Sequence, residues 1–549
     1  MKRPTLETVP VIILVSLYVI IVLNRTFWRK GAVYLDGHEY QLAALGTALF
    51  LLMTAALVSL SVKFVVKPLL IFVILVSAVA SYFVDSFGIM IDREMIANVA
   101  LTTSTEAGQL LTSRFLLHLV AYGLLPSALL LMVKIEHRTW WAKFRQNSLV
   151  VFPSLLVSLA LTLLCYPAFS STFRNHGDLL GTFNPAAPLV ATVKYVKRQM
   201  AERDIVAKPL GTDAHPGERA TASRRPMVTV VVIGETARAL NFGLNGYSRD
   251  TTPELRTRGV TSFRNVSSCG TSTAVSVPCM FSNLTRAGYS SSSARSSENV
   301  TDVLQRGGAK VSWFDNDTGS MGVAARVPYE FLPDSYDPRF CRGGECLDDI
   351  LVDRLRGELT RTRGDTVIVL HQLGSHGPSY YRRYPDGFRT FRPDCRTAEF
   401  ADCKREEIVN AYDNTILYTD HVLAEIVDLL NSRPDLASSM LYVSDHGESL
   451  GENGIYLHAM PYFMAPSTQT HVPMIAWFSG AYKEASGLDG DCVTQLRDQP
   501  LSHDNLFHTL LGLADVATQV YDAKLDAFAA CRSRPGEKHL AFSMKGASR

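Results

Sequence analysis

The chain has 549 residues, a formal net charge of +2 and a mean hydropathy of +0.09. This length exceeds one ordinary domain, and the hydropathy is too high for a purely soluble protein and too low for one embedded entirely in a membrane. The sequence has no basic tract or aromatic-rich basic patch, so we expect no nucleic acid among its partners.

Long apolar runs dominate the chain up to about Phe169, and five of them approach the roughly 20 residues that a helix needs to cross a bilayer. They cover residues 9–23, 42–62, 68–83, 116–133 and 149–169. The first and third are short, so one could instead be a signal peptide or a core helix. For the first run, Lys2 and Arg3 suit a signal sequence, but no small-residue cleavage site follows. We therefore predict a domain of five transmembrane helices over residues 1–170.

Basic residues predict the orientation of these spans, because loops rich in lysine and arginine face the cytoplasm. Such residues occupy the start of the chain and the loops after the second and fourth runs: Lys2, Arg3, Lys63, Lys67, Lys134, Arg138, Lys143 and Arg145. Five spans then place the polar half on the opposite side. We predict a multi-pass protein of the bacterial inner membrane, with this half in the periplasm.

Two amphipathic stretches flank the last spans. The outer loop 85–112 has apolar residues at helical spacing and predicts either a helix lying on the membrane face or a folded connector. Residues 184–200 predict a surface helix after the fifth span, and the polar stretch 201–226 predicts a linker. We assign residues 171–226 to this juxtamembrane helix and linker.

Eight of the nine cysteines lie in the polar half and favour an oxidising compartment. Six form close pairs, which are Cys269 with Cys279, Cys341 with Cys346, and Cys395 with Cys403. The remaining two, Cys492 and Cys531, have no close neighbour, and their pairing stays open. A structural zinc site would need two CxxC-like pairs of cysteines, and none of these spacings provides one. Cys165 lies in an apolar run, which predicts a buried free thiol.

Residues 227–549 alternate between buried strands and helices, which predicts an α/β/α sandwich around a mostly parallel sheet. The predicted strands are residues 227–233, 311–314, 366–370, 439–444 and 473–478, and the predicted helices include 407–430 and 503–514. In such sheets, ligands bind beyond the carboxyl ends of the strands.

Carboxylates and imidazoles follow three of these strands. They are Glu235, then His371 and His376, then Asp445, His446 and Glu448. Aspartate, glutamate and histidine are zinc ligands, so these residues predict a metal site at one rim of the sheet. Each has a structural alternative: Glu235 as a polar turn residue, Asp445 or Glu448 as a helix cap, and His371 as a buried core histidine.

The stretch SCGTSTAVSVPCMFS at residues 268–282 places hydroxyl groups between two cysteines. A hydroxyl becomes a nucleophile only when a base or a metal takes its proton. Thr273 could complete a tetrahedral site with Glu235, Asp445 and His446, but the residue types alone leave Thr271 and Ser272 as equal candidates for the nucleophile.

Four stretches together resemble one known family. They are VVVIGETARALNFGLNGYSRDTTPEL from Val230, SCGTSTAVSVPCMFS, HQLGSHGPSYYRRYP from His371, and YVSDHGESLGENGIYLHAMPYFMAP from Tyr442. They are similar to the lipid A phosphoethanolamine transferases of the polymyxin-resistance type, within the alkaline phosphatase and sulfatase superfamily. The likeness is close over the catalytic half and extends in layout to the five spans.

This resemblance implies Thr273 as the nucleophile that carries phosphoethanolamine covalently, and Glu235, Thr273, Asp445 and His446 as ligands of one tightly bound Zn²⁺. It implies His376 and His458 as a pair that binds substrate phosphate or a second Zn²⁺ and takes part in proton transfer. His371 would lie in the outer shell of the substrate-binding or second-zinc site, and we add Asn316 to the residues of that site. One departure is Met321, which stands where many relatives carry a lysine, with Arg326 as a conceivable substitute.

The implied reaction moves phosphoethanolamine from phosphatidylethanolamine to a lipid A phosphate, which lowers outer-membrane negative charge and gives polymyxin resistance. We expect a monomer. The alternatives are a phosphoethanolamine or phosphoglycerol transferase acting on another periplasmic glycan or a core sugar, a sulfatase, and a non-catalytic lipid- or partner-binding protein. A sulfatase normally needs a CxPxR context, which the nucleophile stretch lacks.

Overall fold

The computed structural model describes residues 4–533, so Lys2 and Arg3 lie outside the described residues. The chain divides into two compact units. The first comprises Met1–Val99 and Leu110–Lys197, and the second comprises Ala100–Gln109 and Arg198–Arg549. The second unit thus includes a short segment from the outer loop between two spans.

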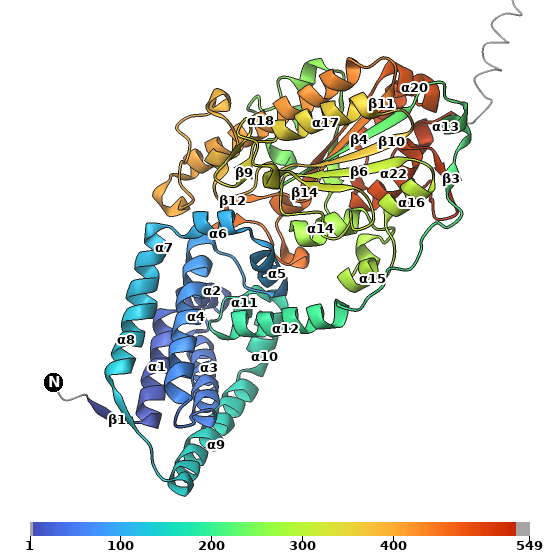
Figure 1. The fold of residues 1–549 in the computed structure, drawn as a ribbon. Coiled ribbons are helices and arrows are strands. Elements are labelled where there is room, and N and C mark those ends of the chain that lie inside the picture. The colour runs from blue at the N-terminus through green and yellow to red at the C-terminus, as the bar shows by residue number, and fades with distance from the viewer. Residues whose placement is uncertain (1–3, 534–549) are drawn as a thin grey trace, which may run out of the picture. The chain divides into compact units, whose positions relative to one another are not determined.

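The first unit is helical and apolar (Figure 1). Helices occupy all five predicted runs: α1 Thr8–Val22, α3 Glu39–Ser59, α4 Val66–Phe87, the segment Ser113–Met132 and α9 Trp140–Leu164. Four are long and apolar enough to span a membrane, and α1 makes a fifth only when joined across a 62° bend to α2 Arg25–Tyr34. Many leucines on α9, such as Leu156 and Leu163, are exposed, as expected of side chains that face lipid.

The outer loop forms two short helices, α5 Arg93–Leu101 and α6 Ser104–Leu110, in place of one long amphipathic helix. Thr102 and Thr103 separate them, in keeping with the low helix propensity of β-branched residues. The predicted surface helix after the fifth span is confirmed as α12 Ala186–Glu202.

The second unit is built on an eight-stranded sheet with the order β15-β5-β14-β11-β4-β10-β6-β7. The five predicted strands are confirmed as β4 Met227–Gly234, β6 Lys310–Asp315, β10 Thr366–His371, β11 Ala437–Ser444 and β14 His471–Phe478. The outer strands are β5 Thr261–Ser267, β7 Tyr329–Phe331 and β15 Leu501–Ser502. Strands β11, β4, β10, β6 and β7 are parallel, whereas β14 is antiparallel to both β11 and β5.

Helices cover both faces of this sheet, which confirms the predicted sandwich (Figure 1). Helices α17 Asp349–Arg361 and α18 Arg405–Asn431 lie on one face. On the other face, α14 Thr273–Met280, α16 Val300–Arg306 and α22 Leu506–Leu513 pack into the main core. Strand β4 is buried along its whole length, which explains its continuous apolar sequence.

Four disulfides link the cysteines of this unit. The three close pairs are confirmed, and Cys492 pairs with Cys531. Cys165, in the first unit, is buried and free, as predicted.

Candidate active site

Neighbouring parallel strands bring the predicted polar residues to one edge of the sheet. Glu235 directly follows β4, His371 ends β10, and Asp445 and His446 directly follow β11. The register aligns Ile233 with His371 and Gly234 with Ser444, so these residues start from the same level of the sheet.

The turn after β4 holds Glu235 in a fixed position. Thr236 has φ of 52°, an uncommon conformation for a β-branched residue, and the Tyr412 hydroxyl donates to its carbonyl oxygen at 2.7 Å. Gly374 approaches the same turn with φ of +51°, and a Cβ there would lie 2.8 Å from the Glu235 carbonyl oxygen. Backbone strain and close packing therefore both fix the turn that carries Glu235.

Glu235, Asp445 and His446 form a compact group of metal-ligating atoms. Each offers one atom, these atoms lie within 4.8 Å of one another, and all three side chains are fully buried. Within the described residues, Glu235 Oε1 and Asp445 Oδ2 have no hydrogen-bond partner. Because a buried carboxylate oxygen without a partner is costly, a divalent cation fits this group well.

The shifted pKa values of Glu235 and His446 also favour a divalent cation at this group. Burial, and then the carboxylates of Asp445 and Asp317, raise the pKa of Glu235 well above its usual value. Burial lowers the pKa of His446 to about 4, so its imidazole is neutral at pH 7. The His446 Nδ1–H group donates to the Gly447 carbonyl oxygen at 2.9 Å, which leaves the Nε2 lone pair facing Asp445 Oδ2 at 3.2 Å. This is the tautomer that binds a metal.

The Thr273 hydroxyl adjoins this group. Thr273 begins α14, its Oγ1 donates to Glu235 Oε2 at 2.9 Å, and Oγ1 lies 3.4 Å from His446 Nε2. Thr271 instead donates its hydroxyl to the Met460 carbonyl oxygen at 2.6 Å. Ser272 is the N-cap residue of α14, and its side chain makes no capping hydrogen bond. Of the three candidate hydroxyls, Thr273 is therefore the one placed against the ligand group.

His376 and His458 lie beside the same group. Their ring centroids are 5.9 Å apart, and those of His458 and His446 are 4.5 Å apart. Burial, and then the charge of Arg383, hold the pKa of His376 well below its usual value. Burial would also lower the pKa of His458, but Glu448, whose Oε2 lies 2.9 Å from Nδ1, raises it above its usual value.

His371 and Asn316 make contacts of a different kind. His371 Nδ1 lies 3.0 Å from Asp315 Oδ2, and Asn316 Nδ2 donates to Asp348 Oδ1 at 2.8 Å. Both side chains are buried.

Comparisons with known proteins identify the family. A family model described as Sulfatase matches residues 228–516, and one described as Phosphoethanolamine transferase EptA/EptB matches residues 49–200. Phosphoethanolamine transferase EptA of Escherichia coli is 40% identical over 542 residues, which are 97% of this chain and 98% of that protein. The chain belongs to the phosphoethanolamine transferase family.

Further relatives agree with this assignment. Phosphatidylethanolamine transferase Mcr-1 of Escherichia coli is 39% identical to the transferase over 474 residues, 83% of this chain and 85% of that protein. The integral membrane lipooligosaccharide phosphoethanolamine transferase A of Neisseria meningitidis superposes with a TM-score of 0.93 at 38% identity, covering 97% of this chain and 100% of that one. The likeness therefore extends over both units.

Arg326 of the transferase does not face the ligand group. Its guanidinium forms two hydrogen bonds with Asp302, at 2.6 and 2.7 Å. Met321 is partly buried and packs against the main core. Arg326 is thus already neutralised at α16 and is poorly placed to replace a lysine at Met321.

Sequence reasoning did not find Glu106, a residue of α6 that belongs to the catalytic unit. Its Oε1 lies 3.6 Å from His376 Nε2. It also missed Asp315 and Asp317, which follow the pattern of polar residues at strand ends that revealed Glu235. That same signal, applied to β6, would have found both aspartates.

Proposed function

We propose that the transferase moves phosphoethanolamine from phosphatidylethanolamine to a phosphate of lipid A, through a covalent phosphoethanolamine ester of Thr273. The observation that carries this proposal is the position of the Thr273 hydroxyl, 2.9 Å from Glu235 Oε2 and 3.4 Å from His446 Nε2.

Glu235, Thr273, Asp445 and His446 would hold one Zn²⁺. Three oxygens and one imidazole nitrogen are suitable zinc donors, and two carboxylate oxygens of this set lack partners among the described residues. When bound, the ion would lower the pKa of the Thr273 hydroxyl and offset negative charge on the transferring phosphoryl group.

In the first step, Thr273 Oγ1 attacks phosphorus and the bond from phosphorus to the diacylglycerol oxygen breaks. Glu235 accepts the Thr273 proton along the existing hydrogen bond. His458, whose pKa is raised by Glu448, donates a proton to the departing diacylglycerol oxygen. The N-terminal end of the α14 dipole, at Thr273, stabilises the phosphoryl oxygens.

In the second step, a lipid A phosphate gives its proton to His458, and its oxygen attacks the phosphorus of the threonine ester. The bond to Thr273 Oγ1 breaks, and Glu235 returns a proton to the threonine. The acceptor gains phosphoethanolamine, and the enzyme regains the state in which it began.

The remaining residues bind the donor headgroup. His376, neutral because its pKa is lowered, and His458 contact the donor phosphate, while the Glu106 carboxylate attracts the ethanolamine ammonium group. Addition of this cationic group to lipid A offsets a negative charge on the outer membrane, which weakens the binding of cationic polymyxins.

Substitution of the three candidate hydroxyls tests the nucleophile. The purified full-length protein is incubated with phosphatidylethanolamine without an acceptor, and its intact mass is measured. Thr273→Ala should give no adduct, whereas Thr271→Ala and Thr273→Ser should retain it. An adduct of undiminished yield on Thr273→Ala would remove Thr273 from the mechanism.

Mass spectrometry of lipid A tests the acceptor. Cells that express the transferase should add phosphoethanolamine to lipid A, and cells that express Thr273→Ala should not. If the adduct forms on Thr273 but lipid A is unchanged, the acceptor is another periplasmic glycan or a core sugar.

A further inference from the structure

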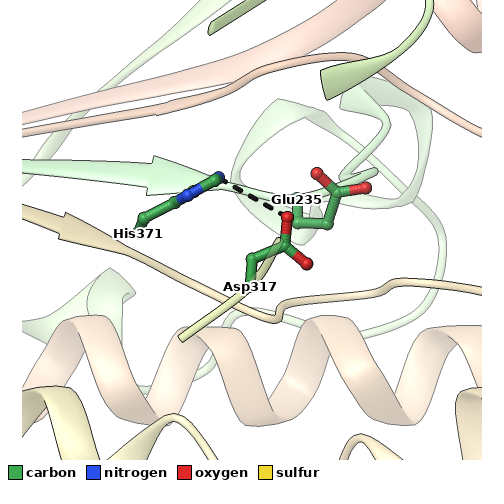
Figure 2. Close-up of side chains that lie close together, drawn as sticks. All are labelled: Glu235, Asp317 and His371. Atoms are coloured by element: carbon green, nitrogen blue, oxygen red, sulfur yellow. Dashed lines mark ion pairs between the residues drawn. The ribbon is translucent and has the colours of Figure 1, made fainter. Parts of the chain in front are cut away.

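A second group of ligand-type side chains adjoins the first and shares Glu235 with it. Glu235, Asp317 and His371 each offer one ligand atom, and these atoms lie within 4.8 Å of one another. All three side chains are buried, with at most 4% exposed. Figure 2 shows the three side chains converging on one region, with His371 directed toward Asp317.

Strand register explains why these residues meet. In the parallel sheet, His371 at the end of β10 is aligned with Ile233 of β4 on one side and with Asp315 of β6 on the other. Glu235 and Asp317 each lie two residues beyond these partners, just past the strand ends. The three side chains therefore come from adjacent strands at one level of the sheet.

Asp315 positions the histidine. Its Oδ2 lies 3.0 Å from His371 Nδ1 and accepts from Trp313 Nε1 at 2.9 Å, while its Oδ1 accepts from the backbone N–H groups of Asp317 and Gly319 at 3.0 Å each. With Nδ1 held by a carboxylate, His371 Nε2 faces Asp317 Oδ2 at 3.8 Å. A carboxylate behind one ring nitrogen is the usual arrangement of a metal-binding histidine.

The atoms that face one another in this group lack partners. Within residues 4–533, His371 Nε2, Asp317 Oδ1 and Glu235 Oε1 are buried and accept or donate no hydrogen bond. The separation of 3.8 Å between His371 Nε2 and Asp317 Oδ2 is too long for a hydrogen bond. Buried polar atoms nearly always have partners, so these three atoms indicate a site for a ligand.

The region holds more buried carboxylates than cationic side chains. Glu235, Asp315, Asp317 and Asp445 are four carboxylates with at most 4% exposed, and within residues 4–533 no lysine or arginine forms an ion pair with them. One divalent cation at the first group would offset two of the four negative charges. Burial lowers the pKa of His371, but Asp315 raises it to about 9, so its imidazolium could offset a third charge. At least one buried negative charge would remain, which is unfavourable in a medium of low dielectric constant.

We propose that Glu235, Asp317 and His371 bind a second divalent cation, which shares Glu235 with the cation at Asp445 and His446. A mixed set of carboxylate and imidazole ligands suits Zn²⁺ or Mn²⁺. The second cation fixes the Glu235 carboxylate from behind and neutralises the aspartates. His376 and His458 are not among its ligands and remain available to substrate.

The proposal extends the metal centre of the proposed function, and metal content tests it without an activity assay. Full-length protein in detergent is saturated with Zn²⁺, passed through a desalting column and measured by inductively coupled plasma mass spectrometry. Wild type should hold about two equivalents per chain and Asp317→Asn about one. Asp334→Asn makes the same change of charge at an exposed position of this unit and should match wild type.

Equal metal content in wild type and Asp317→Asn would overturn the second site while leaving the first intact. A wild type without metal would overturn both sites, and the Thr273 adduct would then still test the transfer chemistry separately.

Electron paramagnetic resonance keeps the test valid if Asp317→Asn does not fold. Chelator-treated wild type is titrated with Mn²⁺. Two ions that share a carboxylate lie about 3.5–4 Å apart and should give an exchange-coupled spectrum at saturation. A spectrum of a single uncoupled Mn²⁺ per chain would overturn the proposal.

Discussion

At the scale of single residues, His503 links the nucleophile loop to the strand that carries two of the candidate metal ligands. Its Nδ1 accepts from the Cys269 N–H at 3.0 Å, and its Nε2–H donates to the Ser444 carbonyl oxygen at 2.9 Å. Both bonds require a neutral ring, and burial lowers the pKa of His503 to about 4. His503 thus holds the start of the Thr273 loop close to Asp445.

The transferase should lose stability in mild acid partly through His503. A histidine with a folded-state pKa of about 4 contributes fully above its unfolded value of about 6.5 and loses that contribution as the pH falls from 6.5 toward 4. The loss is at most roughly 3 kcal/mol. His503→Gln, which can make similar bonds but does not titrate, should show a smaller fall in Tm between pH 7 and pH 5 than wild type.

Scanning fluorimetry of the detergent-solubilised proteins measures this difference. His215→Gln, at an exposed position, should keep the wild-type dependence on pH. Equal falls in Tm for wild type and His503→Gln would contradict the role assigned to His503.

Packing around Gly374 gives a second prediction for a single residue. Gly374→Ala places a methyl group 2.8 Å from the Glu235 carbonyl oxygen at a φ of +51°, so the turn that carries Glu235 must shift. We expect at least a tenfold weaker affinity for Zn²⁺, measured by competition with a chelator. Gly387→Ala, where an added Cβ meets nothing within 4 Å, is the matched control. Unchanged affinity in Gly374→Ala would show that the turn tolerates the methyl group.

The sequence predicted that the residues directly after the buried strands lie together at one edge of the sheet. The reason is that the carboxyl ends of parallel strands share that edge. Sequence reasoning could not choose Thr273 from residue types alone, since the choice depends on which hydroxyl the start of α14 directs at Glu235. Glu106 was not predictable, because nothing in its local sequence signals a contact with His376, some 270 residues later in the chain.

At the scale of elements, α14 is an eight-residue helix clamped by the disulfide between Cys279, on the helix, and Cys269, before it. This bridge closes a short loop, with a separation of 10 residues, whereas Cys492–Cys531 closes one of 39. In the chain-entropy model the longer loop gives about 1 kcal/mol more stability. The first bridge therefore matters more for the geometry of Thr273.

Paired serine substitutions should separate these roles. Replacing Cys492 and Cys531 should lower Tm more than replacing Cys269 and Cys279, because it releases the longer loop. Replacing Cys269 and Cys279 should slow formation of the Thr273 adduct more, at least tenfold, because a misplaced nucleophile reacts slowly. The reverse order in the adduct assay would show that the short bridge does not position the nucleophile.

Most elements followed from sequence, and the exceptions have physical reasons. Strands β4 and β11 are buried along their whole length, so each can be recognised in the sequence as a separate strand. Strand β5, TSFRNVS, lies near the edge of the sheet and mixes polar with apolar residues, so its sequence does not stand out. The antiparallel direction of β14 depends on long-range pairing with β11 and β5.

At the scale of the whole molecule, the distribution of charge between loops predicts on which side of the membrane each part lies. Lys63 precedes α4, and Lys67 and Lys143 lie in the first turns of α4 and α9, whereas all eight bridged cysteines belong to the second unit. Loop charge and disulfide formation are independent properties, and both favour a periplasmic second unit.

Labelling of engineered cysteines tests this orientation. In a Cys165→Ala background, Glu484→Cys, at a position where 81% of the side chain is exposed, should react with a membrane-impermeant maleimide in whole cells with a permeabilised outer membrane. Lys63→Cys, also exposed, should react only after lysis. Labelling of Lys63→Cys in intact spheroplasts would reverse the assigned topology.

The segment Ala100–Gln109 has a practical consequence for drug discovery. It belongs to the catalytic unit but is encoded between two membrane helices, almost 100 residues before the rest of that unit begins at Arg198. A soluble fragment that starts at Arg198 therefore presents His376 without its neighbour Glu106. Inhibitors selected against such a fragment would meet His376 without the Glu106 carboxylate, so the affinity of cationic headgroup mimics would be underestimated. Screens against the full-length enzyme avoid this bias.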